Sequence, residues 1–217
     1  MKTVSPVSSE DARTSILANG APPSHPAAVA AFRAARWLVC CDGAYPKALA
    51  LGREPDLVVG DGDSLTAEQK AKLGERFIHI AEQDTNDLDK AFRTVSARFR
   101  VEDGIVILGA GGLREDHFLG NVFRLPGFAQ VAPNVEMVTD AGVFSVVTER
   151  RVYACRPGEA VSVFASEPGT HVRSLGLEWP LDGVSLAALW QGTLNRTTGE
   201  SFTLWSDRPL IVYRPHS

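Results

Sequence analysis

Short apolar runs alternate with helical stretches through the first 130 or so residues, and this alternation constrains the fold more than any other feature. Helical spacing is clearest where Leu88, Phe92 and Val95 follow one another at intervals of four and three. The apolar runs are rich in branched residues, as buried strands are, and lie at 15–20, 37–41, 57–59, 77–80 and 104–108. Strands that alternate with helices predict a parallel sheet with helices on both faces.

The pattern changes near Pro133. From there to the end, helical stripes are few, and Pro-Gly and Asp-Gly turns separate short alternating runs. These runs lie at 135–138, 142–147, 160–164, 184–189, 201–205 and 210–213. They predict an all-β unit, a sandwich or a barrel. We therefore expect an α/β domain at residues 1–132 and a β domain at 133–217.

Composition excludes several classes of protein. The net charge of −4 argues against a nucleic-acid-binding surface. The three cysteines form no Cys-x-x-Cys pair, which indicates free thiols in a reducing compartment. The N-terminus lacks the apolar core of a signal peptide, and no apolar run reaches the ~20 residues needed to span a bilayer. We expect a cytoplasmic protein that does not bind membranes.

Acidic loops follow the predicted strands. Asp42 follows one strand, and Asp61 and Asp63 follow the next. Asp84 lies at the start of the helix that contains Leu88, and Asp87 lies in its first turn. In a parallel sheet such loops share one edge, where ligands bind. Crowded carboxylates repel one another unless a cation neutralises them, and Mg²⁺ prefers oxygen ligands. The alternative for each acid is a turn or a helix cap, with Asp84 or Thr85 as the expected cap of this helix.

A glycine-rich loop, Gly109–Gly112, follows the last predicted strand of the first half. Its backbone N–H groups can approach phosphate at the start of a helix, where Lys90 and Arg114 could add positive charge. Neither the Walker A pattern nor the Gly-x-Gly-x-x-Gly fingerprint is present. The acids and the loop together favour transfer of a phosphate-containing group from a magnesium-bound nucleotide.

Segments 41–44, 56–64, 83–91 and 109–117 resemble, in order and spacing, the four motifs of the thiamine pyrophosphokinase family. Residues 176–181 are similar to a further family motif in the β unit. The resemblance implies an α/β nucleotide-binding catalytic domain and a thiamine-binding β-sandwich. It also implies a homodimer with active sites between the α/β domain of one subunit and the sandwich of the other. The implied reaction moves pyrophosphate from ATP to the hydroxyl of thiamine and releases AMP.

The resemblance also implies roles for individual residues. It makes Asp61, Asp63 and Asp87 the Mg²⁺ ligands, and Asp61, Asp84 and Asp87 the catalytic acids, with Asp61 or Asp84 as the base. The thiamine-binding residues would be Thr193, Asn195 and Trp179. The nucleotide- and phosphate-binding residues would be Asn19, Asp42, Gly43, Ser64, Lys90, Gly111, Gly112, Arg114, Asp116 and His117.

One part of the chain departs from the family pattern. The family has Ser-Asn, one residue and an aromatic, whereas this chain has Leu194 and Thr197 around Asn195. A stacking partner for the acceptor ring is therefore missing there. Trp179 or Trp190 could replace it, although the general burial tendency of Trp favours the core for both. Two alternatives stay open: another acceptor such as a hydroxymethylpterin, or a non-catalytic nucleotide- or thiamine-binding homologue.

Overall fold

The structure is a computed structural model that describes residues 3–4 and 13–216. The chain divides into two compact units. The N-terminal unit is Ser9–Val122 with Met137–Asp140. The C-terminal unit is Phe123–Glu136 and Ala141–Ser217, together with Met1–Ser8. No helix among the described residues is both long enough and apolar enough to cross a membrane.

A parallel sheet forms the centre of the N-terminal unit, with strands in the order β7-β6-β2-β3-β4-β5. Strand β2 pairs with β6 and β3, and β4 pairs with β3 and β5; all four pairings are parallel. The bounds are β2 Thr14–Leu17, β3 Trp37–Cys41, β4 Leu57–Gly60, β5 Phe77–His79, β6 Ile105–Leu108 and β7 Glu136–Val138. Because β2, β3, β4 and β6 run the same way, their following loops lie at one edge.

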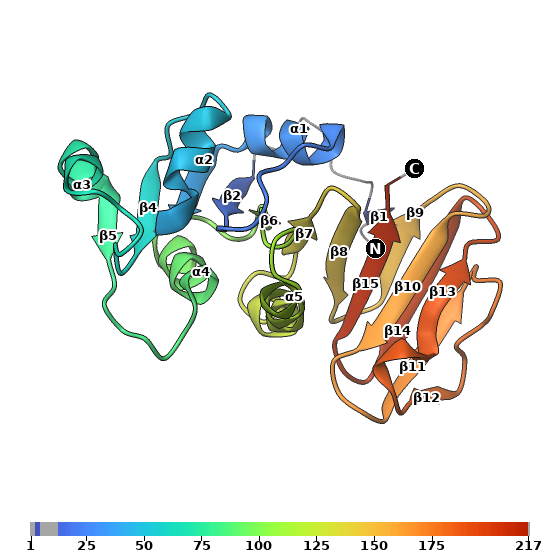
Figure 1. The fold of residues 1–217 in the computed structure, drawn as a ribbon. Helices are drawn as coiled ribbons and strands as arrows, with labels where there is room; N and C mark the ends of the chain where they lie inside the picture. Colours follow the sequence, from blue (N-terminus) through green and yellow to red (C-terminus); the bar gives the residue numbers. More distant parts are fainter. Residues whose placement is uncertain (1–2, 5–12, 217) are drawn as a thin grey trace. The chain divides into compact units, whose positions relative to one another are not determined.

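Helices cover both faces of this sheet, as the sequence predicts: α1 and α2 lie on one side and α4 on the other (Figure 1). The bounds are α1 Pro26–Ala34, α2 Tyr45–Ala50, α3 Ala67–Leu73, α4 Asp87–Arg98 and α5 Glu115–Ala129, with 3₁₀ turns η1 Asp42–Ala44, η2 Gly74–Arg76 and η3 Leu189–Gln191. A capping box starts α3, in which the Thr66 side chain accepts from Gln69 N and Gln69 reaches back to Thr66 N.

One expectation in this half is wrong. The cap of α4 is Asn86, whose side chain accepts a hydrogen bond from Asp89 N, and not Asp84 or Thr85. Several polar residues in a row could each serve as a cap, and the loop conformation decides between them. The run 135–138 contains β7, which neighbours β6, and residues 137–138 belong to the N-terminal unit.

The C-terminal unit is a sandwich of two sheets, which confirms the predicted fold class. One sheet has the order β1-β9-β14-β11-β12, and strands β13-β10-β15-β8 form the other. The bounds are β1 Thr3–Val4, β8 Gly142–Val147, β9 Arg151–Ala154, β10 Ala160–Ala165, β11 Thr170–Leu175, β12 Val184–Leu186, β13 Gly192–Arg196, β14 Ser201–Ser206 and β15 Leu210–Pro215. Both sheets contribute to one apolar core, with Tyr153 stacked on Phe202 at 4.8 Å.

Candidate active site

Asp42 lies at the carboxyl end of β3 and is almost completely buried, with 1% of its surface exposed. Its carboxylate accepts hydrogen bonds from the backbone N–H groups of Gly43, at 2.6 Å, and Gly62, at 2.9 Å. Burial, followed by the charge of Asp87, raises its pKa, although the two N–H donors oppose the rise. Asp42 therefore joins the loops after β3 and β4 and places a negative charge in a dry position.

Asp61 and Asp63 lie in the loop after β4 and face Asp42. One oxygen atom from each of the three carboxylates lies within 4.8 Å of the others. Asp61 accepts hydrogen bonds from Gln83 Nε2 at 2.7 Å and from Asp63 N at 3.1 Å, and these contacts lower its pKa. Three acids this close together, one of them buried, have the oxygen-rich character that a divalent cation requires.

Glycines make this approach sterically possible. A Cβ atom on Gly60 would lie 2.5 Å from Cγ of Asp42, so a side chain there would displace the buried carboxylate. Gly62 has a φ of 79°, which side-chain-bearing residues rarely adopt. The Gly-Asp-Gly-Asp sequence at the end of β4 thus turns the chain and leaves space for the carboxylate of Asp42.

Asp87 and Lys90 lie in the first turn of α4, next to this cluster. Lys90 Nζ donates to Asp87 Oδ1 at 3.2 Å, and the Lys90 side chain is only 2% exposed. Asp87 raises the pKa of Asp42, and Lys90 contributes to the lowered pKa of Asp61, so both charges act on the cluster. Asp87 is nevertheless outside the set of three carboxylates within 4.8 Å, whereas Asp42, expected to bind nucleotide, is inside it.

Glu82 fixes the loop that contains Asp84, a role that the sequence did not reveal. Its carboxylate accepts hydrogen bonds from Asp84 N at 2.8 Å, Thr85 N at 3.1 Å, Thr85 Oγ1 and Arg93. These contacts lower the pKa of Glu82 to about 2, with the Thr85 hydroxyl as the largest cause. The carboxylate of Asp84 itself is exposed and has no hydrogen-bond partner among the described residues.

The loops after β2 and β6 contact each other through backbone atoms. Gly20 N donates to Gly109 O at 2.6 Å, and a Cβ atom on Gly20 would lie 2.4 Å from the oxygens of Gly109 and Gly111. Asn121 Nδ2 donates to Ala110 O at 2.9 Å and so connects the glycine loop to α5. The glycines are therefore required for close packing, independently of any phosphate contact.

Lys47 is a second residue that the sequence did not single out. Its Nζ donates to Asn19 O, Asn19 Oδ1 and Gly20 O, at 2.7–2.8 Å. Desolvation lowers its pKa. Asn19 also packs against Gly43, where a Cβ atom would lie 2.1 Å from Asn19 Nδ2. Lys47 thus positions Asn19, a predicted nucleotide-binding residue, beside the loop after β3.

The remaining predicted phosphate-binding residues are exposed. Arg114 forms a bidentate ion pair with Asp116, at 3.1 and 2.5 Å, at the start of α5. Hydrogen bonding to Arg114 lowers the pKa of Asp116 to about 2. His117 is exposed next to this pair, and Ser64 Oγ donates to Asp63 Oδ1 at 3.0 Å. Arg114 is therefore paired with Asp116, and a phosphate would have to compete for it.

The predicted thiamine-binding residues lie in the C-terminal unit. Asn195 is buried and holds Trp179: its Oδ1 accepts from Trp179 N at 3.2 Å and its Nδ2 donates to Trp179 O at 2.7 Å. Thr193 Oγ1 donates to Trp190 O at 2.7 Å. Trp179 is 53% exposed and Trp190 72% exposed, so the expectation that both lie in the core is wrong. Asn195 therefore holds the main chain of Trp179, whose ring is exposed.

The two departures from the family motif have different surroundings. Leu194 is 82% exposed and has a φ of 60°, the left-handed conformation that is uncommon outside glycine. Thr197 is buried, donates to Arg156 O at 2.6 Å and accepts from Glu159 N at 3.0 Å. Thr197 therefore has a structural role, whereas the Leu194 side chain is free to meet a ligand or a partner.

Comparison with known proteins gives consistent matches to one family. A family model described as thiamin pyrophosphokinase, catalytic domain, matches residues 29–138. A second, thiamin pyrophosphokinase, substrate-binding domain, matches residues 142–213. Thiamine pyrophosphokinase 1 from Oryza sativa subsp. japonica is 28% identical over 211 residues, which covers 82% of this chain and 78% of that protein.

Solved structures share the fold. Thiamin pyrophosphokinase from Candida albicans superposes with a TM-score of 0.78 at 15% identity, covering 100% of this chain and 93% of that one. Thiamine pyrophosphokinase from Bacillus subtilis has a TM-score of 0.77 at 19% identity, covering 94% and 100%. The catalytic-domain model spans just over half of the chain and contains Asp42, Asp61 and Asp63. This chain belongs to the thiamin pyrophosphokinase family of enzymes.

Proposed function

We propose that this chain transfers the pyrophosphoryl group of magnesium-bound ATP to the hydroxyl of thiamine, giving thiamine diphosphate and AMP. The observation that carries the proposal is the carboxylate cluster of Asp42, Asp61 and Asp63 at the carboxyl ends of β3 and β4. Attack on a phosphoryl group needs little covalent help from a protein, and positioning and charge neutralisation supply most of the rate. A cluster of acids that binds a cation, beside a buried lysine, provides both.

The cluster fits Mg²⁺ by its chemistry. All the donor atoms are carboxylate oxygens, and Asp42 is buried among other acids, so a bound cation would neutralise their negative charge. Asp42, Asp61 and Asp63 would hold the ion, with Asp87 adjacent. The bound cation would neutralise phosphate charge and align the triphosphate. The set expected from the family, Asp61, Asp63 and Asp87, is thus extended by Asp42.

Protein groups around the cluster have separate tasks in this proposal. Lys90 supplies a desolvated positive charge for the transferred phosphates, and the backbone of Gly111 and Gly112 binds the remaining phosphate oxygens. Gln83 orients Asp61 through its 2.7 Å hydrogen bond. Glu82 and Arg93 hold the backbone of Asp84 and Thr85 in one conformation.

The hydroxyl of the acceptor must lose a proton to a nearby base. Asp61 and Asp84 are the two candidates from the sequence. The pKa of Asp61 is lowered by its hydrogen bonds, which suits a permanently charged metal ligand and makes a weaker base. The carboxylate of Asp84 is exposed and has no hydrogen-bond partner among the described residues. We therefore assign the base to Asp84.

Acceptor binding is assigned to Trp179, Thr193 and Asn195 of the C-terminal unit. The exposed ring of Trp179 offers a flat face for the pyrimidine or thiazolium ring, and Asn195 holds the main chain of Trp179 through two hydrogen bonds. This replaces the aromatic residue that the family has at the position of Thr197. We also propose that the chain works as a homodimer, as the family resemblance implies.

The direct test is AMP release from ATP at fixed Mg²⁺, with and without thiamine, with the product identified as thiamine diphosphate. Thiamine-dependent AMP release is expected, and Asp63→Asn should reduce it at least ~100-fold by analogy with the loss of a charge-stabilising group. Glu68→Gln, which changes an exposed acid in α3, is the matched control. Full activity in Asp63→Asn, or AMP release only with hydroxymethylpterin, would overturn the assignment.

A further inference from the structure

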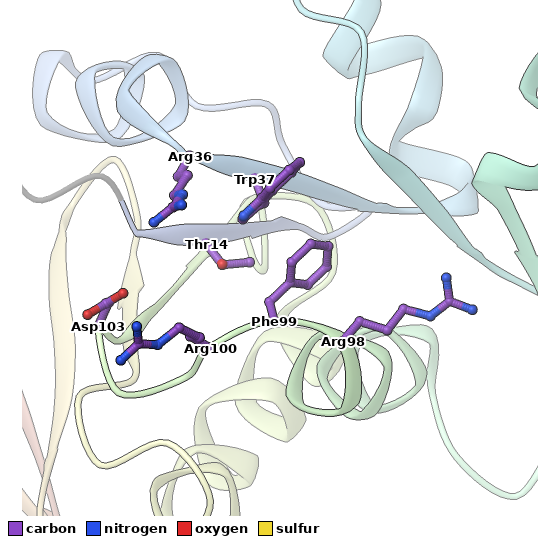
Figure 2. Close-up of a pocket in the computed structure, with 7 residues that line it drawn as sticks. All are labelled: Thr14, Arg36, Trp37, Arg98, Phe99, Arg100 and Asp103. Carbon is purple, nitrogen blue, oxygen red and sulfur yellow. The ribbon is translucent and has the colours of Figure 1, made fainter.

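A pocket lies at the opposite edge of the parallel sheet from the carboxylate cluster. Its walls come from the first residues of two strands and from the segment after α4: Thr14, Arg36, Trp37, Phe99, Arg100 and Asp103 line it, with Arg98 at one side (Figure 2). Thr14 and Trp37 are paired in register at the amino ends of β2 and β3. The acids follow the other ends of β3 and β4, so the pocket is separate from the candidate active site.

The pocket is positively charged. Three arginines and one aspartate line it, and neither Arg36 nor Arg98 forms an ion pair with any residue in the described part of the chain. Arg100 contacts Glu102 at 3.8 Å, but both side chains are largely exposed, so that pair is weak. In Figure 2, Arg36 and Arg100 lie at the same end of the pocket as Asp103, and Arg98 lies at the other end. Arginine guanidinium groups that are not already paired with a carboxylate commonly bind phosphate.

The pocket also has an aromatic wall. The rings of Trp37 and Phe99 lie 5.3 Å apart at an angle of 33°, and Trp37 is 39% exposed. An exposed tryptophan face is a stacking surface for a flat ring. Asp103 would repel a bare anion, yet its carboxylate accepts hydrogen bonds from hydroxyl groups, as acids do from ribose in nucleotide sites. The cavity of about 250 Å³ has room for one small ligand.

We propose that this pocket is a second binding site, and that its ligand is a nucleoside monophosphate. Arg36 and Arg100 bind the phosphate, the exposed face of Trp37, which packs against Phe99, stacks on the base, and Asp103 accepts from the ribose hydroxyls. The combination of cationic, aromatic and acidic groups distinguishes this ligand from inorganic phosphate and from an uncharged nucleoside. The inference does not rest on the proposed reaction, because it uses none of the residues assigned to that reaction.

The test is calorimetric titration of the full chain with AMP, adenosine and inorganic phosphate, in buffer with EDTA. Chelation removes the cation that the carboxylate cluster would need to bind phosphate. We expect AMP to bind more tightly than either fragment. Arg36→Gln should weaken AMP binding about tenfold, the effect of losing one charge-assisted contact. Arg33→Gln, an exposed arginine on α1 that does not line the pocket, is the matched control.

A second variant tests the ring contact. Trp37→Leu should remove the preference for AMP over inorganic phosphate and leave phosphate binding unchanged, with circular dichroism to confirm the fold. AMP binding that is equal in wild type and Arg36→Gln would overturn the proposal. So would inorganic phosphate that binds as tightly as AMP to the wild-type chain, because the base would then not be recognised.

Discussion

The buried carboxylate of Asp42 accepts a hydrogen bond from Gly62 N at 2.9 Å, which connects the end of β3 to the loop that contains Asp61 and Asp63. Burial, followed by the charge of Asp87, raises the pKa of the same carboxylate above the ordinary value. Asp42 therefore holds the loop in place through hydrogen bonds and at the same time destabilises it through charge. A cation would remove the second effect and keep the first.

Asp42→Asn separates these two effects. Without Mg²⁺, we expect its free energy of unfolding to stay within about 1 kcal/mol of wild type, because a lost hydrogen-bond acceptor and a lost buried charge offset each other. With Mg²⁺ at roughly 100 times its Kd, wild type should gain about 2.7 kcal/mol and the variant much less. Urea unfolding with and without MgCl₂ measures both values. Equal stabilisation of the two proteins by Mg²⁺ would remove Asp42 from the metal site.

Lys90→Met should lower kcat about 100-fold by removing a desolvated charge from the phosphate site. Stability should change little, because Met fills the buried space of the lysine chain and Asp87, which is 40% exposed, keeps its contact with water. Steady-state kinetics and thermal unfolding are the measurements, with Lys72→Met in α3 as the control. An active Lys90→Met enzyme would restrict the lysine to a structural role.

Glu82→Gln tests the loop that contains Asp84. The charge-assisted contacts to Thr85 and Arg93 weaken, so we expect kcat to fall about tenfold through misplacement of Asp84, with little change in KM for ATP. The pKa of Glu82 is lowered from 4.5 to about 2 on folding, so its ionised form stabilises the protein above pH 4.5. That contribution is lost as the pH falls from 4.5 towards 2.

Acid unfolding of wild type and Glu82→Gln provides the readout for this pH dependence. The difference in stability between the two proteins should be largest above pH 4.5 and should disappear below about pH 2, where the wild-type carboxyl becomes protonated. Arg93→Lys, which keeps the charge but not the guanidinium geometry, should show an intermediate loss of kcat. A constant difference in stability across this pH range would contradict the assignment.

Two inactive variants test the proposed homodimer with shared sites. Asp63→Asn inactivates the N-terminal unit, and Trp179→Ala removes the proposed ring contact in the C-terminal unit. If each site uses one unit from each subunit, random mixing after refolding should restore about a quarter of wild-type activity. Light scattering establishes the oligomeric state, and a mixture of either variant with itself is the control. No recovery in a mixture that forms dimers would place each site within one chain.

The sequence predicted the parallel sheet well because its strands are continuous apolar runs, and it predicted that acids would follow them. Asp42, Asp61 and Asp63 do converge. The roles of Glu82 and Lys47 could not be predicted, since each depends on several hydrogen bonds made possible only by the folded loops. Strands β9, β11 and β13 were also missed: β13, Gly192–Arg196, has weak strand propensity and is placed by its pairing with β10.

The exposed rings of Trp179 and Trp190 were misjudged for a related reason. A burial tendency describes an average over many proteins, and it carries no information about a side chain held at the surface for a ligand. In this chain the side chain of the buried Asn195 forms hydrogen bonds with the main chain of Trp179, which lies 16 positions away in the sequence. Spacing along the sequence gives no sign of such a contact.

Gly20 meets Gly109 and Gly111 through main-chain atoms alone, with no space for even a methyl group between them. Main-chain atoms are the same in every residue, so substitution cannot vary the atoms of this contact, and a side chain on Gly20 would not fit. Mutant libraries that aim to change the acceptor substrate should leave these glycines unchanged. They should randomise the sandwich surface around Leu194, whose side chain is largely exposed.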